Sequence, residues 1–353
     1  MTREQSTPVA STQPATETHE AGSTRRTERI RLGRTGPHVF PFALGCMGMS
    51  DFYGAADETE SIATIHAALD RGVQVLDTGD FYGLGANELL IGKALRGRRR
   101  DDAVVSVKFG ALRSPDGGFH GADGRPASVK SFLAYSLVRL GLDHVDVYRP
   151  ARLDPTVPIE DTIGAIADMV RAGYVRAIGL SEVGPETIRR AHAVHPIVDL
   201  QIEYSLVSRG PERAIFPVLD ELGIAVTAYG ILSRGLLTGS GPTGPTDFRA
   251  HLPRFTGENR ARNEAIVQAL HRLASERDVS PAQLAIAWAR AKGAHIVPLV
   301  GARTRRQLDE SLAAMTLRLS PEEVARIEDA VPSSQVSGTR YPEPLMQHLD
   351  SER

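Results

Sequence analysis

The sequence predicts an α/β protein: a (β/α)8 TIM barrel with an N-terminal hairpin and a long loop after the seventh strand. Eight short apolar runs alternate with longer amphipathic segments over roughly 300 residues, as such a barrel requires. The runs are almost continuously apolar, which is typical of a parallel sheet covered on both faces. They span residues 42–45, 73–77, 104–108, 145–148, 175–180, 198–202, 225–228 and 296–299.

Helical segments are predicted between these runs. Residues 58–71 carry apolar side chains at helical spacing and end before Gly72, a typical helix stop. Residues 162–172 follow the same pattern. A third helix is predicted over 281–291, because Ser280 can cap its first turn and a proline follows at the first helical position.

Two further segments lie outside the alternation. Residues 29–32 and 38–40 flank a glycine-rich turn and are predicted to form a hairpin that closes the bottom of the barrel. Residues 239–263 contain four glycines and three prolines and are too long for an ordinary connection. Long loops in compact domains often serve as lids or binding loops.

The main rival is a doubly wound sheet, which usually carries G-x-G-x-x-G after its first strand when it binds a dinucleotide. Here the first strand is followed by Cys46-Met47-Gly48-Met49, and the nearest match, Gly83-Leu84-Gly85, lacks the third glycine. We therefore predict one barrel domain over 28–335, preceded by a disordered tail over 1–27 and followed by a C-terminal tail over 336–353.

Composition limits the functional classes. The chain has 353 residues, 41% of them hydrophobic and 24% charged, and a net charge of −2, which argues against nucleic acid or anionic membrane as a partner. No apolar stretch is long enough to span a membrane, and residues 1–27 lack the apolar centre of a secretory signal. The single cysteine, Cys46, excludes an internal disulfide, so we expect a cytoplasmic protein. We also expect a small-molecule substrate, and homo-oligomerisation stays open.

Three polar side chains lie at or near the ends of consecutive predicted strands. Asp77 ends the second strand, Tyr82 lies in the loop after it, and Lys108 ends the third. Catalytic groups of barrels lie at the carboxyl ends of strands, so these side chains should share one rim. A nearby ammonium should lower the pKa of the phenol, and a carboxylate should keep that lysine charged and oriented. Such a tyrosine can protonate a carbonyl oxygen while hydride reaches the carbon.

At these residues the chain resembles the aldo-keto reductase superfamily, from residue 28 to about 330. The motifs that carry the resemblance are Leu76-Asp77-Thr78-Gly79-Asp80-Phe81-Tyr82-Gly83, Val107-Lys108, Asp154-Pro155, Pro158-Ile159-Glu160-Asp161-Thr162, Ile178-Gly179-Leu180-Ser181, Gln201-Ile202-Glu203-Tyr204-Ser205, Ala228-Tyr229, Gly235-Leu236-Leu237 and Pro253-Arg254-Phe255. The resemblance implies a barrel that binds NADPH across its rim and reduces carbonyl groups.

The resemblance also implies that Asp77, Lys108 and Tyr82 are three of four catalytic residues, with Tyr82 as the acid. The fourth is usually a histidine that orients the substrate oxygen, and Ala151 occupies its position here. Loss of such a donor costs about 10²–10³ in rate. Arg149 or Arg152 could replace it, although Arg152 is also expected to play a structural part beside Asp154.

For the cofactor, the resemblance implies several binding residues along the rim. Ser181 and Gln201 would hold the nicotinamide carboxamide, and Tyr229 would stack on the ring, while Glu182 replaces a common asparagine. The turn from Gly230 through Leu232 to Arg234 would wrap the pyrophosphate. The predicted adenine-end residues are Gly301, Arg303, Gln307 and Ser311, with Arg303 on the 2′-phosphate, which favours NADPH over NADH.

The predicted substrate pocket contains Cys46, Met47, Ala151 and Arg149, although a buried, inert thiol is an equal alternative for Cys46. No metal site is predicted, because His192 and His195 have no cysteine or acidic cluster beside them. The position of Ala151 leaves two alternatives to a general carbonyl reductase. One is an NADPH-binding regulatory subunit with little turnover, and the other is a reductase of a cyclic, pyridoxal-like or imine substrate.

Overall fold

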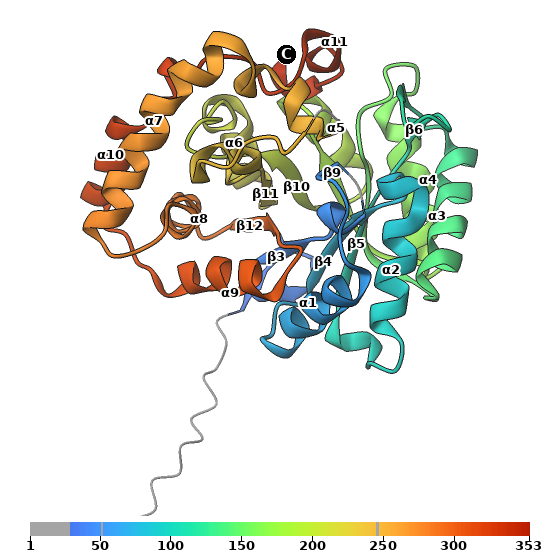
Figure 1. The fold of residues 1–353 in the computed structure, drawn as a ribbon. Coiled ribbons are helices and arrows are strands. Elements are labelled where there is room, and N and C mark those ends of the chain that lie inside the picture. Colours follow the sequence, from blue (N-terminus) through green and yellow to red (C-terminus); the bar gives the residue numbers. More distant parts are fainter. Residues whose placement is uncertain (1–28, 51, 245–246) are drawn as a thin grey trace, which may run out of the picture.

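The structure, a computed structural model, describes residues 29–50, 52–244 and 247–353. Eight parallel strands close into a barrel, and helices surround it (Figure 1). The strands are β3 (Ala43–Gly45), β4 (Val75–Gly79), β5 (Val104–Phe109), β8 (Val145–Pro150), β9 (Val175–Ser181), β10 (Ile197–Glu203), β11 (Ala225–Tyr229) and β12 (Ile296–Gly301). All eight predicted barrel strands are confirmed.

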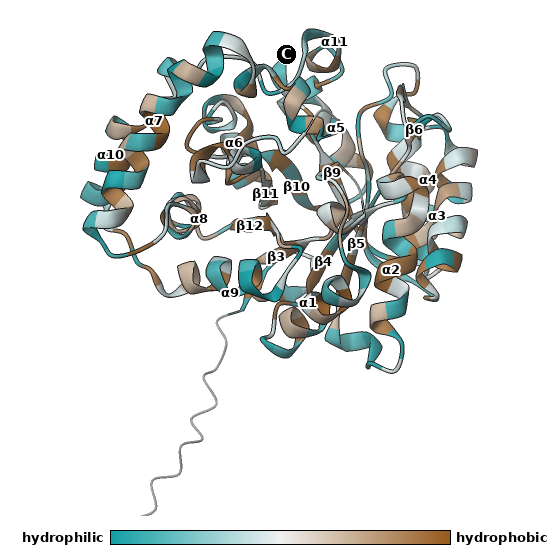
Figure 2. Cartoon of the chain, viewed as in Figure 1, coloured by the Kyte–Doolittle hydropathy of each residue, from teal (hydrophilic) through white to brown (hydrophobic). Residues whose placement is uncertain are grey.

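The order of strands around the barrel follows the chain, from β3 to β4, β5, β8, β9, β10, β11 and β12, and then back to β3. Gly45 pairs with Asp77, Asp77 with Ser106, and Gly301 with Gly45 across the closing seam. The buried strands are mostly apolar, and the surrounding helices turn polar residues outward (Figure 2). This pattern is the reason why continuous apolar runs in the sequence indicated parallel strands.

A layer of helices surrounds the barrel. They are α1 (Glu58–Asp70), α2 (Ala86–Leu95), α3 (Pro126–Leu140), α4 (Ile159–Arg171), α5 (Pro185–Val194), α6 (Pro211–Leu222), α7 (Gly257–Glu276), α8 (Pro281–Ala291), α9 (Arg305–Ala313) and α10 (Pro321–Ala330). Most neighbours in the ring pack against each other, and α9 packs on α1 to complete the ring. The helix predicted over 162–172 begins three residues earlier, behind Pro158.

Two hairpins flank the barrel. The first, β1 (Ile30–Arg31) with β2 (His38–Val39), is the hairpin that the sequence predicts. Leu32 and Val39 pack in a cluster with residues at the amino-terminal ends of the barrel strands, which closes that end. The second, β6 (Ala111–Arg113) with β7 (Phe119–Ala122), follows β5 and has no counterpart among the predicted elements.

The long loop predicted over 239–263 follows β11 and is only partly irregular. It contains short 3-10 helices over Phe248–His251 and Pro253–Phe255 and then runs into α7. Leu252 and Phe255 are buried there in a small apolar cluster, so this part of the loop is packed rather than open.

The residues assigned to a C-terminal tail, 336–353, pack on the barrel near α5 and contain the short helix α11 (Glu343–Met346) (Figure 1). Asp350 accepts hydrogen bonds from the backbone of Gly184 and the hydroxyl of Thr187, at the start of α5. The predicted N-terminal tail, 1–27, lies outside the described residues. Within the described ranges, no helix is long and apolar enough to cross a membrane.

Candidate active site

Asp77 is the centre of a buried polar network at the carboxyl ends of the barrel strands. It forms an ion pair with Lys108 from β5, and both side chains are about 4% exposed. Its Oδ2 atom accepts hydrogen bonds from Ser106 Oγ at 3.1 Å and from Gln201 Nε2 at 2.7 Å. The strand register brings Gly79 opposite Lys108, so the carboxylate and the ammonium meet at one rim, as the sequence predicts.

Tyr82 lies on the turn after β4, where three residues with positive φ, Gly83, Leu84 and Gly85, reverse the chain. The ring is 7% exposed, and Lys108 Nζ lies 5.0 Å from its centroid. The acid, the amine and the phenol that the sequence singles out are therefore brought together. The αL conformation of Leu84 carries a strain that only a well-packed turn sustains.

The electrostatics of the phenol differ from the sequence-based expectation. Burial raises the pKa of Tyr82 well above its ordinary value, and the charge of Asp77 raises it further, while Arg152 opposes them. Burial also lowers the pKa of Lys108, against the attraction of Asp77. The expected lowering of the Tyr82 pKa by Lys108 is thus outweighed, because the ammonium is neutralised by Asp77 and the phenol is desolvated.

Two of the residues predicted for the substrate pocket are buried in the protein interior. Arg149 is 1% exposed and points into the barrel, where it donates to Asp199 Oδ2 at 3.0 Å and to Ser106 Oγ at 2.9 Å. Cys46 is fully buried in the main apolar core, and burial raises the pKa of its thiol. Both side chains therefore contact the interior, and their part in a substrate pocket stays a prediction, because spacing along a strand does not reveal how deep a side chain lies.

The other two predicted pocket residues lie nearer the rim. Met47 is half-buried in a 3-10 turn after β3. Ala151 follows β8, is 1% exposed, and donates its backbone N–H to the Phe109 carbonyl at 2.8 Å. The next residue, Arg152, is half-buried and hydrogen bonds the Ala151 carbonyl at 2.6 Å.

The residues predicted to hold a nicotinamide ring lie at the ends of β9, β10 and β11. Ser181 and Gln201 pair in register, and the Ser181 side chain, 1% exposed as a residue, has no hydrogen-bond partner among the described residues. Gln201 instead donates to Asp77, which ties it to the proposed acid–base group. Tyr229 is half-buried, and its hydroxyl donates to Glu182 at 2.8 Å.

Glu182 is the most heavily bound carboxylate of this rim. It is fully buried, has a φ of 52°, and accepts hydrogen bonds from Tyr229, Arg340, Ser351 and the backbone N–H of Glu203. Burial alone would raise the pKa of Glu182, but the charge of Arg340 holds it well below its usual range. The C-terminal segment is thereby joined to the end of β9, which sequence reasoning missed.

The turn after β11 has the backbone of an anion-binding loop, because Gly230, Ser233, Arg234 and Gly235 all have positive φ. However, the cation predicted to bind the pyrophosphate, Arg234, already has protein partners. Arg234 donates to Glu203 Oε2 at 2.8 Å and lies over the Tyr341 ring at 4.6 Å. Leu232 is half-buried beside this turn.

The residues predicted for the adenine end cluster at the start of α9. Thr304 caps this helix, and Gln307 accepts a hydrogen bond from the Arg303 backbone at 2.8 Å. Arg303 Nη1 donates to the Tyr53 carbonyl at 2.9 Å, and Ser311 Oγ donates to the Gln307 carbonyl at 2.9 Å. Arg303 and Gln307 therefore meet at the start of α9, and Ser311 lies one turn beyond Gln307.

A flat cofactor fits the rim on two observations. Gly301 is exposed and pairs with Gly45, and a Cβ atom on Gly301 would meet no atom closer than Gly45 O at 3.8 Å, so backbone is open to a ligand there. Ser181 is 1% exposed as a residue, and its hydroxyl makes no hydrogen bond within the described ranges. Ser181 and Tyr229 lie at the ends of β9 and β11, and Arg303 directly precedes the N-cap of α9, so the residues predicted for the cofactor all lie at the ends of barrel strands.

An aromatic wall surrounds Tyr82 and was not predicted from the sequence. Phe52 lies edge-on to Tyr82 at 6.3 Å between centroids and stacks on Phe119 at 6.2 Å, while Phe81 lies 4.7 Å from Tyr82. Phe248 contacts Phe52 at 5.6 Å. These rings come from four separate loops, so no local sequence pattern could have grouped them.

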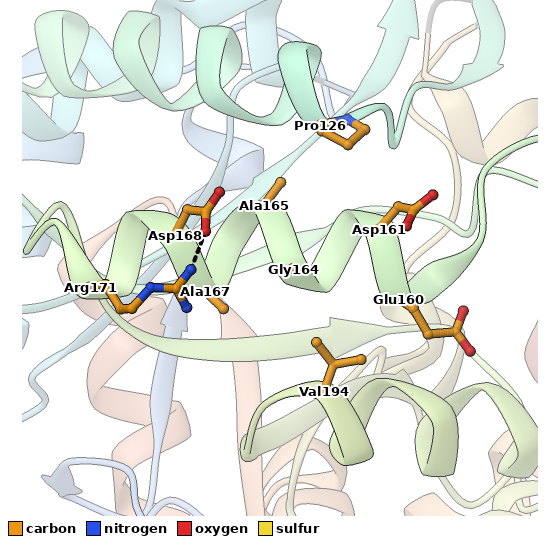
Figure 3. Close-up of a pocket in the computed structure, with 9 residues that line it drawn as sticks. All are labelled: Pro126, Glu160, Asp161, Gly164, Ala165, Ala167, Asp168, Arg171 and Val194. Atoms are coloured by element: carbon orange, nitrogen blue, oxygen red, sulfur yellow. Dashed lines mark hydrogen bonds and ion pairs between the residues drawn. The ribbon is translucent and has the colours of Figure 1, made fainter.

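A hollow of about 370 Å³ on the outside of the barrel is not a competing site (Figure 3). It lies along α4, with Pro126 of α3 and Val194 of α5 at its edges, and Asp168 and Arg171 within it are ion-paired. It contains none of the groups at the strand ends. No cluster of three or more metal-ligating side chains occurs among the described residues.

Comparison with known proteins agrees with this geometry. Residues 41–332 match the Aldo/keto reductase family. The chain is 40% identical to probable aldo-keto reductase 1 of Glycine max over 320 residues, covering 88% of this chain and 91% of that protein.

Two solved structures are also similar. One is the glycerol dehydrogenase of Gluconobacter oxydans, with a TM-score of 0.78, 26% identity, and coverage of 92% of this chain and 97% of that chain. The other is an aldo-keto reductase of Bacillus halodurans in its holo form, with a TM-score of 0.72, 28% identity, and coverage of 87% and 97%. By its matched segment and its barrel, this chain belongs to the Aldo/keto reductase family.

Proposed function

We propose that this protein is an NADPH-dependent reductase of aldehydes and ketones, with Tyr82 as the proton donor. Membership of the family supports nicotinamide-dependent carbonyl reduction in general. The observation that carries the specific proposal is the meeting of Asp77, Lys108 and Tyr82 at one rim, beside Ser181 and Tyr229.

Each side chain has a role that its surroundings support. Tyr82 is a neutral phenol at neutral pH, because burial keeps the pKa of its hydroxyl high, so it can hydrogen bond a carbonyl oxygen and donate to it. Lys108 stabilises the phenolate that remains, and Asp77 keeps Lys108 charged and fixed. A bound reduced nicotinamide supplies the hydride that reaches the carbonyl carbon.

The choice of NADPH rests on Arg303. Its backbone is bound to Gln307 at the start of α9, a helix end where a phosphate group is favoured, and its guanidinium contacts the Tyr53 carbonyl. Only Nη1 is used in the two backbone contacts that Arg303 makes, so other donors of the fork are available for the 2′-phosphate of NADPH.

The proposed activity is tested by NADPH oxidation against a panel of aldehydes and ketones. We expect Tyr82→Phe to lower kcat by about 10²–10⁴ on every substrate that the wild type reduces. Tyr135→Phe is the matched control, because Tyr135 is 60% exposed on α3. Equal rates for wild type and Tyr82→Phe would refute the assigned acid.

A second candidate is an NADPH-binding regulatory protein with little turnover. Two observations favour it: Ala151 stands where a histidine donor is expected, and the C-terminal segment binds Glu182 and Tyr341 contacts Tyr229 at the rim. Tight NADPH binding with no turnover on the whole panel would support this candidate over the first.

A further inference from the structure

Arg152 occupies an unusual position among the arginines of the barrel mouth. Arg234 and Arg254 both pair with Glu203, and Arg340 pairs with Glu182. Arg152, in contrast, has no carboxylate within salt-bridge distance in the part of the chain that the structure describes. Its one hydrogen bond runs from Nη1 to the Ala151 carbonyl at 2.6 Å.

Two nitrogen atoms of the Arg152 guanidinium have no hydrogen-bond acceptor within the described ranges. Because Nη1 is taken by the Ala151 carbonyl, the Nε and Nη2 donors of Arg152 have no acceptor among the described residues. These two N–H groups lie parallel on one edge of the guanidinium, the geometry that binds two oxygens at once. The side chain is half-buried, so this fork is held near the rim yet reachable from solvent.

The charge of Arg152 acts on both the proposed acid and the proposed ring-stacking residue. It lowers the pKa of Tyr82 and of Tyr229, in both cases against the larger effect of burial, and it adds to the lowering of the Glu182 pKa by Arg340. Arg152 also directly follows Ala151, whose backbone is bound to the end of β5, the strand of Lys108. Arg152 therefore lies just beyond the end of β8, the strand that pairs with the strand of Lys108.

We infer that Arg152 determines substrate specificity, by holding the reacting carbonyl oxygen and a second oxygen on the neighbouring carbon. The substrate class is that of 1,2-dicarbonyl compounds, which carry oxygens on adjacent carbons and place both on one side in the s-cis conformation that Arg152 would select. This inference rests on the proposed function, because the reacting oxygen is the one that Tyr82 protonates.

The reaction balances as a two-electron reduction of one carbonyl group. The C=O π bond breaks, the carbon receives hydride from the nicotinamide, and the oxygen receives the proton of Tyr82. The product is a 2-hydroxy ketone, and the Tyr82 phenolate regains its proton from solvent. The second carbonyl is unchanged and remains bound to Arg152 as an orienting group.

The aromatic wall formed by Phe52, Phe81 and Phe119 suits a substrate that carries a ring. A matched pair of probes is therefore 1-phenylpropane-1,2-dione and 1-phenylpropan-1-one, which share one carbon skeleton and differ by one carbonyl group. The readout is the ratio of kcat/KM for the dione to kcat/KM for the ketone, measured with NADPH.

Arg152→Lys keeps the positive charge but removes the two parallel N–H donors of the guanidinium. We expect it to lower kcat/KM for the dione by about 10²-fold and for the ketone by at most about tenfold, so the ratio falls. Arg152→Ala should lower the ratio further, and added guanidinium should restore part of the dione activity. Arg171→Lys is the control, because Arg171 is exposed on α4 and pairs with Asp168.

The outcomes separate this inference from the proposed function. If Arg152→Lys leaves the ratio unchanged, the inference is wrong, whatever Tyr82→Phe does. If Tyr82→Phe turns over both probes at the wild-type rate, the proposed function itself fails. A melting curve for each variant, matched to wild type, confirms that a changed ratio does not come from unfolding.

Discussion

Arg340 donates two hydrogen bonds to Glu182, from Nη1 to Oε1 at 3.0 Å and from Nη2 to Oε2 at 2.8 Å. The two residues are 158 positions apart in the chain, and both are buried. The pair joins the C-terminal segment to the end of β9, next to Ser181. The rim of the barrel is therefore shaped partly by residues that follow the last barrel helix.

Breaking this pair should be costly to stability. Arg340→Ala leaves the Glu182 carboxylate buried without its main partner, and we expect the free energy of unfolding to fall by about 3–5 kcal/mol. Urea denaturation measures this change. Arg326→Ala, at an exposed ion pair with Glu276, should change it by about 0.5 kcal/mol or less.

A double variant separates the pair from the packing of Arg340. Adding Glu182→Gln removes the uncompensated charge, so the double variant should be clearly more stable than Arg340→Ala alone. Additive losses would show that Arg340 acts by packing and that the ion pair contributes little.

Asp80 should make stability depend on pH near neutrality. Its Oδ2 accepts from the Gly110 backbone, but its Oδ1 is buried with no partner among the described residues, and burial raises the pKa of Asp80 to about 7. A carboxyl whose pKa is higher in the folded state is favoured there as the neutral acid. Its contribution therefore becomes unfavourable as pH rises from about 4 to about 7.

Asp80→Asn removes that titration. We expect the variant to gain stability relative to wild type by about 1–3 kcal/mol as pH rises from about 4 to about 7. Urea denaturation of both proteins across this range gives the measurement. A constant difference between them at every pH would contradict the raised pKa of Asp80.

Ala151 is expected to leave room for a bulky or cyclic substrate. Ala151→His adds an imidazole at a position that is 1% exposed, which should cost about 1–3 kcal/mol of stability and narrow the site. We expect kcat/KM for 1-phenylpropane-1,2-dione to fall about tenfold or more, with a smaller loss for butane-2,3-dione. Ala151→Ser serves as the control for a small side chain. Faster reduction of both diones by Ala151→His would contradict the role in substrate size.

The sequence predicted the barrel well, because each strand is a continuous apolar run that ends in a turn signal. Asp77, Tyr82 and Lys108 were found for the same reason, since their places at strand ends determine which rim they share. Depth and long-range contacts were not predictable. Whether Arg149 points inward or outward depends on Asp199, fifty positions away, and not on its neighbours in the chain.

The aromatic wall and the binding of Arg340 to Glu182 escaped prediction because both join distant loops. Arg152 is a more instructive case. Its position beside Asp154 suggested a structural part, yet Asp154 accepts hydrogen bonds from Gly124 and Thr156 instead. Only the positions of the hydrogen-bond acceptors around Arg152 in the folded chain show that one edge of its guanidinium has no partner among the described residues.

The central claim is that Tyr82 donates the proton during carbonyl reduction. Rapid mixing of the NADPH complex with excess substrate, for wild type and Tyr82→Phe, measures the chemical step apart from binding and product release. We expect the rate of NADPH oxidation to be at least about 10²-fold lower for Tyr82→Phe, with NADPH binding unchanged. An equal rate of this step in the two proteins would contradict it.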